Sequence, residues 1–195
     1  YLYGNVSEAL VYIMKAKELL DYILIYYSVD YNFYYSLILS DLYDTCGEEK
    51  YMEQIKANQR QMKVWSDNCP QNFLHKYLLV EAELFRISGR EMDALDFYNQ
   101  AIVQAGKYEF MKDEALAQEL AGKFCLKRGN TDYGRLHLRK AFYFYHYWGA
   151  VHKIQDMKEK YGEYLKEDEE YDKRFAGKDL LSFSSDSLDL ETVIR

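Results

Sequence analysis

Apolar residues recur along the chain at the spacing of one face of an α-helix. Around Gly89 they fall at i, i+4 and i+7, stop at the glycine, and resume with the same spacing. The first set is Leu78, Ala82 and Phe85, and the second is Ala94, Tyr98 and Ala101. This pattern predicts two amphipathic helices joined by a tight turn, with a positive φ at the glycine. The small alanines predict a close approach between the helices.

The same frame recurs at four glycines. The positions five, nine and twelve residues after each glycine are Ala9, Ile13 and Ala16 for Gly4; Met52, Lys56 and Gln59 for Gly47; Ala94, Tyr98 and Ala101 for Gly89; and Gly134, Leu138 and Ala141 for Gly129. The set after Gly47 is a poor match. The glycines are 43, 42 and 40 residues apart, and a fixed period built from two helices indicates a solenoid. We therefore expect an all-α solenoid of antiparallel helix pairs.

The pattern also predicts the helix boundaries and no strand. The helices are expected near 6–27, 31–46, 48–67, 71–88, 90–106, 111–128, 131–148 and 150–166. They form one expected domain, 1–167, and the charged, serine-rich stretch 168–195 is expected to be a linker toward a following domain. Because the first residues read as the inside of a helical hairpin, we expect the chain to be part of a larger protein.

The residues around Gly89 resemble the tetratricopeptide consensus, and this resemblance implies a tetratricopeptide-like α-α superhelix. They depart from it in a longer period and in Gly106, which stands where that repeat ends with proline. A broader resemblance, to the helical region of multidomain hybrid sensor kinases, rests on the segments 65–73, 81–84, 94–98, 113–117 and 147–150. The segment 187–194 is similar to the lead into the GAF domain of those proteins.

The resemblance implies a place in a signal-transduction protein. Those proteins carry a serine/threonine-kinase-like domain and an AAA (STAND-type) ATPase before the repeats, and a GAF domain and a histidine kinase after them. This chain has no phosphate-binding loop, no phosphoacceptor box and no kinase catalytic motif. We therefore expect a non-catalytic scaffold without a cofactor, whose partner is protein: the flanking domains, or a peptide of another protein.

Charge and cysteines restrict the surroundings of the chain. A formal net charge of −7 without a basic cluster argues against nucleic acid and anionic membranes as partners. No apolar run approaches the roughly 20 residues of a membrane span. The scattered cysteines, Cys46, Cys69 and Cys125, are typical of reduced thiols and predict a cytoplasmic location. No sequence pattern addresses the oligomeric state.

The first helix of each pair is expected to line a concave groove. The candidate contacts on these helices are Lys76, Leu79, Glu83 and Arg86 in one pair and Glu119, Lys123 and Lys127 in the next. Their spacing keeps each set on one helix face. A groove of exposed mixed charge is suited to a peptide or a neighbouring domain. The alternative is a solvated face without a ligand.

Two other functions stay open at this stage. A free-standing adaptor would use the same groove for peptides. An all-α, metal-dependent enzyme would need converging carboxylates, and the run 168–172 is the one candidate. The four histidines, His75, His137, His146 and His152, lack the Glu-x-x-His spacing of a helical metal site, so we expect neither metal ligands nor catalytic residues among them.

Overall fold

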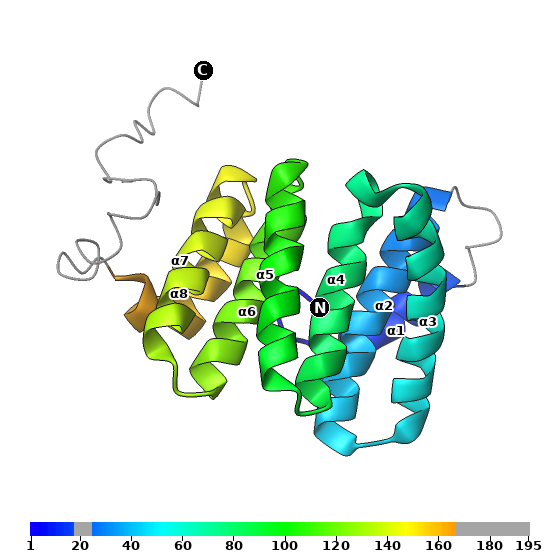
Figure 1. Ribbon diagram of the computed structural model, residues 1–195. Coiled ribbons are helices and arrows are strands. Elements are labelled where there is room, and N and C mark those ends of the chain that lie inside the picture. Colours follow the sequence, from blue (N-terminus) through cyan, green and yellow to red (C-terminus); the bar gives the residue numbers. More distant parts are fainter. Residues whose placement is uncertain (18–24, 167–195) are drawn as a thin grey trace. The chain divides into compact units, whose positions relative to one another are not determined.

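The computed structural model describes residues 1–17 and 25–166, which form helices and no strand. The helices are α1 Val6–Lys17, α2 Ile25–Cys46, α3 Glu49–Asn68, α4 Pro70–Ile87, α5 Glu91–Lys107, α6 Met111–Lys127, α7 Thr131–Tyr147 and α8 Val151–Leu165. Each helix packs against the next one in the chain, as Figure 1 shows. In addition, α2 contacts α4, and α4 contacts α6, so that the first helices of successive pairs lie side by side. The predicted all-α class is confirmed, and this packing is consistent with a helical-repeat superhelix.

The turn glycines take the backbone conformation that the sequence predicts. Gly4, Gly47, Gly89 and Gly129 have φ between 68° and 79°, and Gly149, which lies outside the predicted frame, has φ 80°. After Gly89 the amide of Arg90 donates to the carbonyl of Phe85 at 2.9 Å, and the residues after Gly129 and Gly149 make the same bond five residues back. This bond closes the C-terminal end of the helix before each of these three glycines. It requires a left-handed conformation at the residue that precedes the donor, and glycine adopts this conformation without strain.

The frames after Gly89 and Gly129 lie in the core. Its members Ala94, Tyr98, Ala101, Leu138 and Ala141 are at most 1% exposed. At the first position of the frame, five residues after the turn glycine, the other frames have alanine or methionine and the last has Gly134. A Cβ there would lie 2.5 Å from Cδ2 of Leu126. The helices α6 and α7 therefore approach more closely than an alanine at this position would allow.

The frames after Gly4 and Gly47 are weaker. Ala9 and Ala16 are only half-buried, and α1 has no fully buried residue. In α3, Met52 and Gln59 are buried, while Lys56 is exposed and Ile55 takes the inward position beside it. The helix period thus survives in α3, with the inward face shifted by one residue.

The predicted boundary between the first two helices is wrong. Helices were expected at 6–27 and 31–46, but α2 begins at Ile25 and continues through Ser28, Val29 and Asp30. These three residues include no glycine or proline, and Val29 and Phe33 are both buried at helical spacing. Ser28 and Asp30 are polar and half-buried, and polar residues at such positions do not end a helix. The expected helix over 18–24 and the expected linker 168–195 lie outside the described residues.

Two adjoining clusters make up the core of the compact unit Tyr1–Leu165. The larger joins α2 to α6, and the smaller joins α6, α7 and α8 through Ala115, Tyr145 and Met157. Burial of each helix face against the next pair stabilises such a stack. Within the described residues no helix has the length and apolar character that crossing a membrane requires.

Candidate functional site

The predicted groove residues lie on one side of α4 and α6, which with the facing sides of α2 and α8 we call the inner face. Most of them are not exposed. Lys76, Leu79, Glu83 and Glu119 are each at most 2% exposed. The side chains of the other three, Arg86, Lys123 and Lys127, are 13%, 41% and 69% exposed. Helical spacing placed these residues on a common face, but the expected exposure of their charges is wrong for the buried ones.

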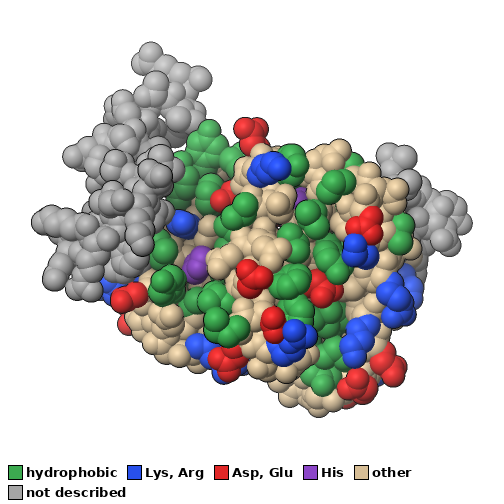
Figure 2. Space-filling model, in the orientation of Figure 1, with side chains coloured by type: hydrophobic (Ala, Val, Ile, Leu, Met, Phe, Trp, Pro, Cys, Tyr) green, Lys and Arg blue, Asp and Glu red, His purple; other side chains and the backbone are tan. Residues whose placement is uncertain are grey.

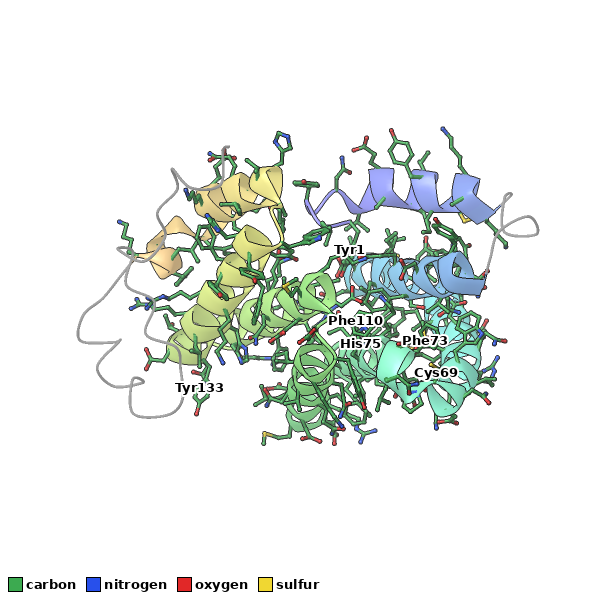
Figure 3. All side chains as sticks on the ribbon, turned by 90° about the horizontal axis from the view of Figure 1, so that it is seen from above. Tyr1, Cys69, Phe73, His75, Phe110 and Tyr133 are labelled. Atoms are coloured by element: carbon green, nitrogen blue, oxygen red, sulfur yellow. The ribbon has the colours of Figure 1, made fainter. Side chains whose placement is uncertain are left out.

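Lys76 belongs to a buried polar network that joins three helices. Its Nζ lies 2.5 Å from Oδ2 of Asp113 on α6 and 3.1 Å from Oδ1 of Asp30 on α2. His75 Nε2 lies 2.9 Å from the same Asp113 oxygen. The ring of His75 stacks on Phe110 with centroids 4.5 Å apart, and Figure 3 shows the two side by side. The network connects first helices to one another.

The charges in this network are fixed near neutral pH. Burial alone would raise the pKa of Asp113, but the hydrogen bond to His75 and the charge of Lys76 hold it well below the ordinary value. Burial lowers the pKa of His75, so the imidazole is neutral at pH 7. The pKa of Lys76 is raised, because its two carboxylate partners outweigh its burial. A buried lysine–aspartate pair thus forms, with neutral His75 as a further partner.

Glu83 is the centre of a second cluster. Its Oε1 accepts a hydrogen bond from the hydroxyl of Tyr98 on α5. Its Oε2 accepts from Nε of Arg86 at 2.7 Å and from Oγ of Ser40 on α2 at 3.3 Å. Arg86 also donates to Asp44 on α2 at 2.9 Å. A buried carboxylate with a cation and two hydroxyl donors is well satisfied, and here it links α2, α4 and α5.

Asp41 adds a second acid to this cluster. Burial and the nearby charge of Glu83 raise the pKa of Asp41 to about 6, against the opposing pull of Arg86. The exposed Lys127 reaches Asp44 across the same face, with Nζ 3.2 Å from Oδ2. The predicted Arg86 and Lys127 are therefore engaged with α2.

Glu119 is the centre of a third cluster, at the boundary of α6, α7 and α8. Its Oε2 accepts from the hydroxyl of Tyr145 at 3.0 Å. Two ammonium groups lie near its Oε1, that of Lys153 at 3.0 Å and that of Lys123 at 3.1 Å. Lys153, 2% exposed, also lies 3.1 Å from Asp156. The cluster is built like that of Glu83, but the buried cation comes from the next helix pair.

The first residues of the chain lie against this face. The Nζ of Lys153 donates to the main-chain carbonyl of Leu2, and Nζ of Lys160 donates to that of Tyr3 at 2.8 Å. Gly4 then turns the chain into α1, its amide bonded to the carbonyl of Tyr1 at 2.8 Å. We call residues 1–4 the N-terminal segment. It runs between α1 and α8, as Figure 3 shows at Tyr1.

Tyr1 is the inward anchor of this segment. Its ring meets the edge of Tyr34 on α2, with centroids 6.4 Å apart, and packs on the larger core cluster. Burial, then the charges of Asp41 and Glu83, raise the pKa of Tyr1 well above its ordinary value. The buried hydroxyl has no hydrogen-bond partner among the described residues. The inner face thus holds a short turn of the chain, with the ring of Tyr1 packed on the core.

Several residues of this site were not predicted. Tyr145 continues the helical spacing of Leu138 and Ala141, so the frame contained a signal for its burial. Lys153 and Lys160 had none, because their partners lie 151 and 157 residues away in the sequence.

Comparison of the chain with protein-family models, curated proteins and solved structures finds no match. Among the described residues, no group of three or more His, Cys, Asp or Glu side chains is placed to hold a metal ion. The acidic run 168–172 lies outside those residues.

Proposed function

We propose that this chain is a non-catalytic helical-repeat scaffold that binds a polypeptide segment on its inner face. The observation that supports the proposal is the N-terminal segment itself, with two main-chain carbonyls bound by Lys153 and Lys160 and one ring in the core. These contacts to main-chain carbonyls and to one aromatic ring are of the kind that would hold a segment of another polypeptide.

The contacts favour exchange with a second segment. Main-chain carbonyls occur in every peptide, so the two lysines recognise the backbone and not one sequence. Tyr1 supplies apolar contact, but burying its hydroxyl without a partner costs about 1–3 kcal/mol. The N-terminal segment is therefore an imperfect occupant, and a segment of better fit can displace it.

Peptide binding in trans tests the proposal. The probe is a fluorescein-labelled peptide with the sequence of residues 1–8, titrated against the unmodified chain and against the double variant Tyr1→Ala, Leu2→Ala. An internal occupant lowers apparent affinity by the fraction of time that it occupies the face. Weakening it should therefore tighten peptide binding by roughly tenfold or more, measured by fluorescence anisotropy.

A matched control changes two apolar residues of α1 away from this face. Val11 and Tyr12 are 53% and 63% exposed, and the double variant Val11→Ala, Tyr12→Ala should leave the affinity unchanged. If the Tyr1, Leu2 variant melts like the unmodified chain yet binds the peptide no better than this control, the inner face is not an exchangeable site.

The resemblance to hybrid sensor kinases extends the proposal to a parent protein. There the stack would connect an upstream ATPase to a downstream sensor kinase in the cytoplasm, with flanking domains as partners. Deleting 70–150 in that parent should abolish regulation of kinase output, and undiminished regulation would contradict the coupling role. A complete reading frame without ATPase and GAF modules would instead favour a free-standing peptide-binding adaptor.

A further inference from the structure

A groove lies between α3 and α4, with the start of α5 at one end. Its volume is about 600 Å³, and its lining includes four basic side chains, Lys56, Arg60, Lys63 and Arg90. Figure 2 shows Lys and Arg side chains at the right of the view, where α3 lies, with Asp, Glu and hydrophobic side chains among them. A basic groove contrasts with the formal net charge of −7 of the whole chain.

Two of these four cations have no ion pair. Lys63 lies 2.5 Å from Asp67, and Arg90 lies 2.8 Å from Asp93. Lys56 and Arg60 make no salt bridge within the described residues, and both are exposed, one helical turn apart on α3. The one acidic side chain in the lining is Glu81. The groove therefore presents uncompensated positive charge.

A buried acceptor also lines the groove. Gln59 is 4% exposed, and its Nε2 donates to the carbonyl of Tyr77 at 3.1 Å and to Oε1 of Glu81 at 2.8 Å. These two acceptors fix the orientation of the amide. Its Oε1 has no donor among the described residues. This oxygen is also closed to solvent, so a ligand in the groove cannot reach it unless the side chain moves.

The aromatic rings in the lining are already covered. Nζ of Lys63 lies 5.8 Å from the ring centroid of Tyr77, and the guanidinium carbon of Arg90 lies 4.3 Å from that of Phe85. A nucleobase that stacked on either ring would have to displace a cation. An acidic peptide needs no such displacement, because it can bring its carboxylates to Lys56 and Arg60.

We propose that this groove is a second interaction surface, which binds an acidic, extended segment of a partner protein. It lies on α3 and α4, away from the N-terminal segment, so it is independent of the function proposed for the inner face. In it, Lys56 and Arg60 bind the carboxylates of the partner.

Anisotropy titrations at low salt with a fluorescein-labelled peptide of alternating glutamate and serine test this proposal. The charge-reversal variant Lys56→Glu, Arg60→Glu should weaken binding by roughly tenfold. The control Lys15→Glu, Lys17→Glu makes the same change of net charge on α1 and should shift the Kd less than about twofold, by long-range charge alone. Thermal melting verifies that both variants fold.

Two further probes separate the occupants. A peptide of alternating lysine and serine should not bind, and a single-stranded oligonucleotide should bind more weakly than the acidic peptide. The proposal is overturned if the acidic peptide shows no binding at 100 µM, a concentration on the order of the Kd of a weak peptide complex. It is also overturned if both double variants bind equally, or if the oligonucleotide binds more tightly than the peptide and depends on Lys56 and Arg60.

Discussion

Two buried glutamates, Glu83 and Glu119, have their negative charge compensated by different partners. Each is 2% exposed, and each accepts a hydrogen bond from a tyrosine of the following helix. Glu83 takes its cation from one turn along its own helix, Arg86, and Glu119 takes its buried cation from the next helix pair, Lys153. Only the second cation also holds a carbonyl of the N-terminal segment.

The source of the cation decides which parts of the molecule depend on each other. A buried carboxylate is tolerated only while a cation and hydrogen-bond donors compensate it. At Glu83 the compensation stays within α2, α4 and α5, so that cluster stabilises the stack. At Glu119 the compensation connects α6, α8 and the N-terminal segment. Occupancy of the inner face and packing of the last helix are therefore coupled there.

Removing the cation at Glu83 should have the largest effect. Arg86→Met leaves Glu83 buried without a positive charge and leaves two aspartates of α2 without their common partner. We expect a loss of about 3–5 kcal/mol in the free energy of unfolding, measured by urea denaturation. Arg86→Lys should recover part of it. A loss below about 1 kcal/mol, the value of a surface pair, would show that Glu83 does not need Arg86.

Removing the cation at Glu119 should cost less. In Lys153→Met, the Nζ of Lys123 still lies 3.1 Å from Glu119, so we expect a loss of roughly 2–3 kcal/mol. In addition, amide hydrogen exchange in residues 2–5 should accelerate. Lys160→Met is the matched control, because it removes one carbonyl contact without touching Glu119. Equal exchange in both variants would argue against coupling through Lys153.

The same comparison shows how far the sequence can predict this molecule. The glycine frame predicted the turns, the helix pairs and the buried Ala94, Tyr98 and Ala101, because these depend on residues close in sequence. The spacing of polar residues assigned Glu83 and Glu119 to the exposed face of a groove. It could not show that they are buried, because helical spacing gives the direction of a side chain and not what covers it.

The covering residues come from far along the chain. Lys153 meets Leu2 across 151 positions, and neither residue has a spacing that predicts the other. Tyr1 likewise fits no repeat position. The fold follows from local periodicity, whereas the site depends on one segment that departs from it. The inward face of α3 is an intermediate case. Its helical spacing could be predicted from the sequence, but not that Ile55 rather than Lys56 faces inward.

The tyrosine hydroxyls sharpen the comparison with a smaller expected effect. Tyr98→Phe and Tyr145→Phe each remove one hydrogen bond to a buried carboxylate and should cost about 1.5–3 kcal/mol. Tyr1→Phe removes a buried hydroxyl that has no partner and should be neutral or stabilising. Urea denaturation of all three variants tests this order. A loss at Tyr1 equal to the other two would show that its hydroxyl is bonded.

The smallest expected difference lies in the pH dependence of the two clusters. The folded pKa of Asp41, about 6, lies above its ordinary value of 3.8, so the folded chain binds more protons than the unfolded chain between these values. The stability that this proton contributes is fully present below pH 3.8 and is lost as the pH rises through 6. Asp41→Asn removes the dependence, and its Tm relative to the unmodified chain should rise between pH 4 and 8.

Asp156 in the Glu119 cluster provides the opposite case. Burial would raise its pKa, but hydrogen bonds from Lys160 and Lys153 lower it below 3.8. Its contribution to stability is therefore present above that value and is lost only as the pH falls further. The Tm of Asp156→Asn relative to the unmodified chain should stay nearly constant from pH 5 to 8, while that of Asp41→Asn rises. If the two Tm differences changed with pH in parallel, Asp41 and Asp156 would be in the same charge state. The two clusters would then differ in the source of their cation but not in their protonation.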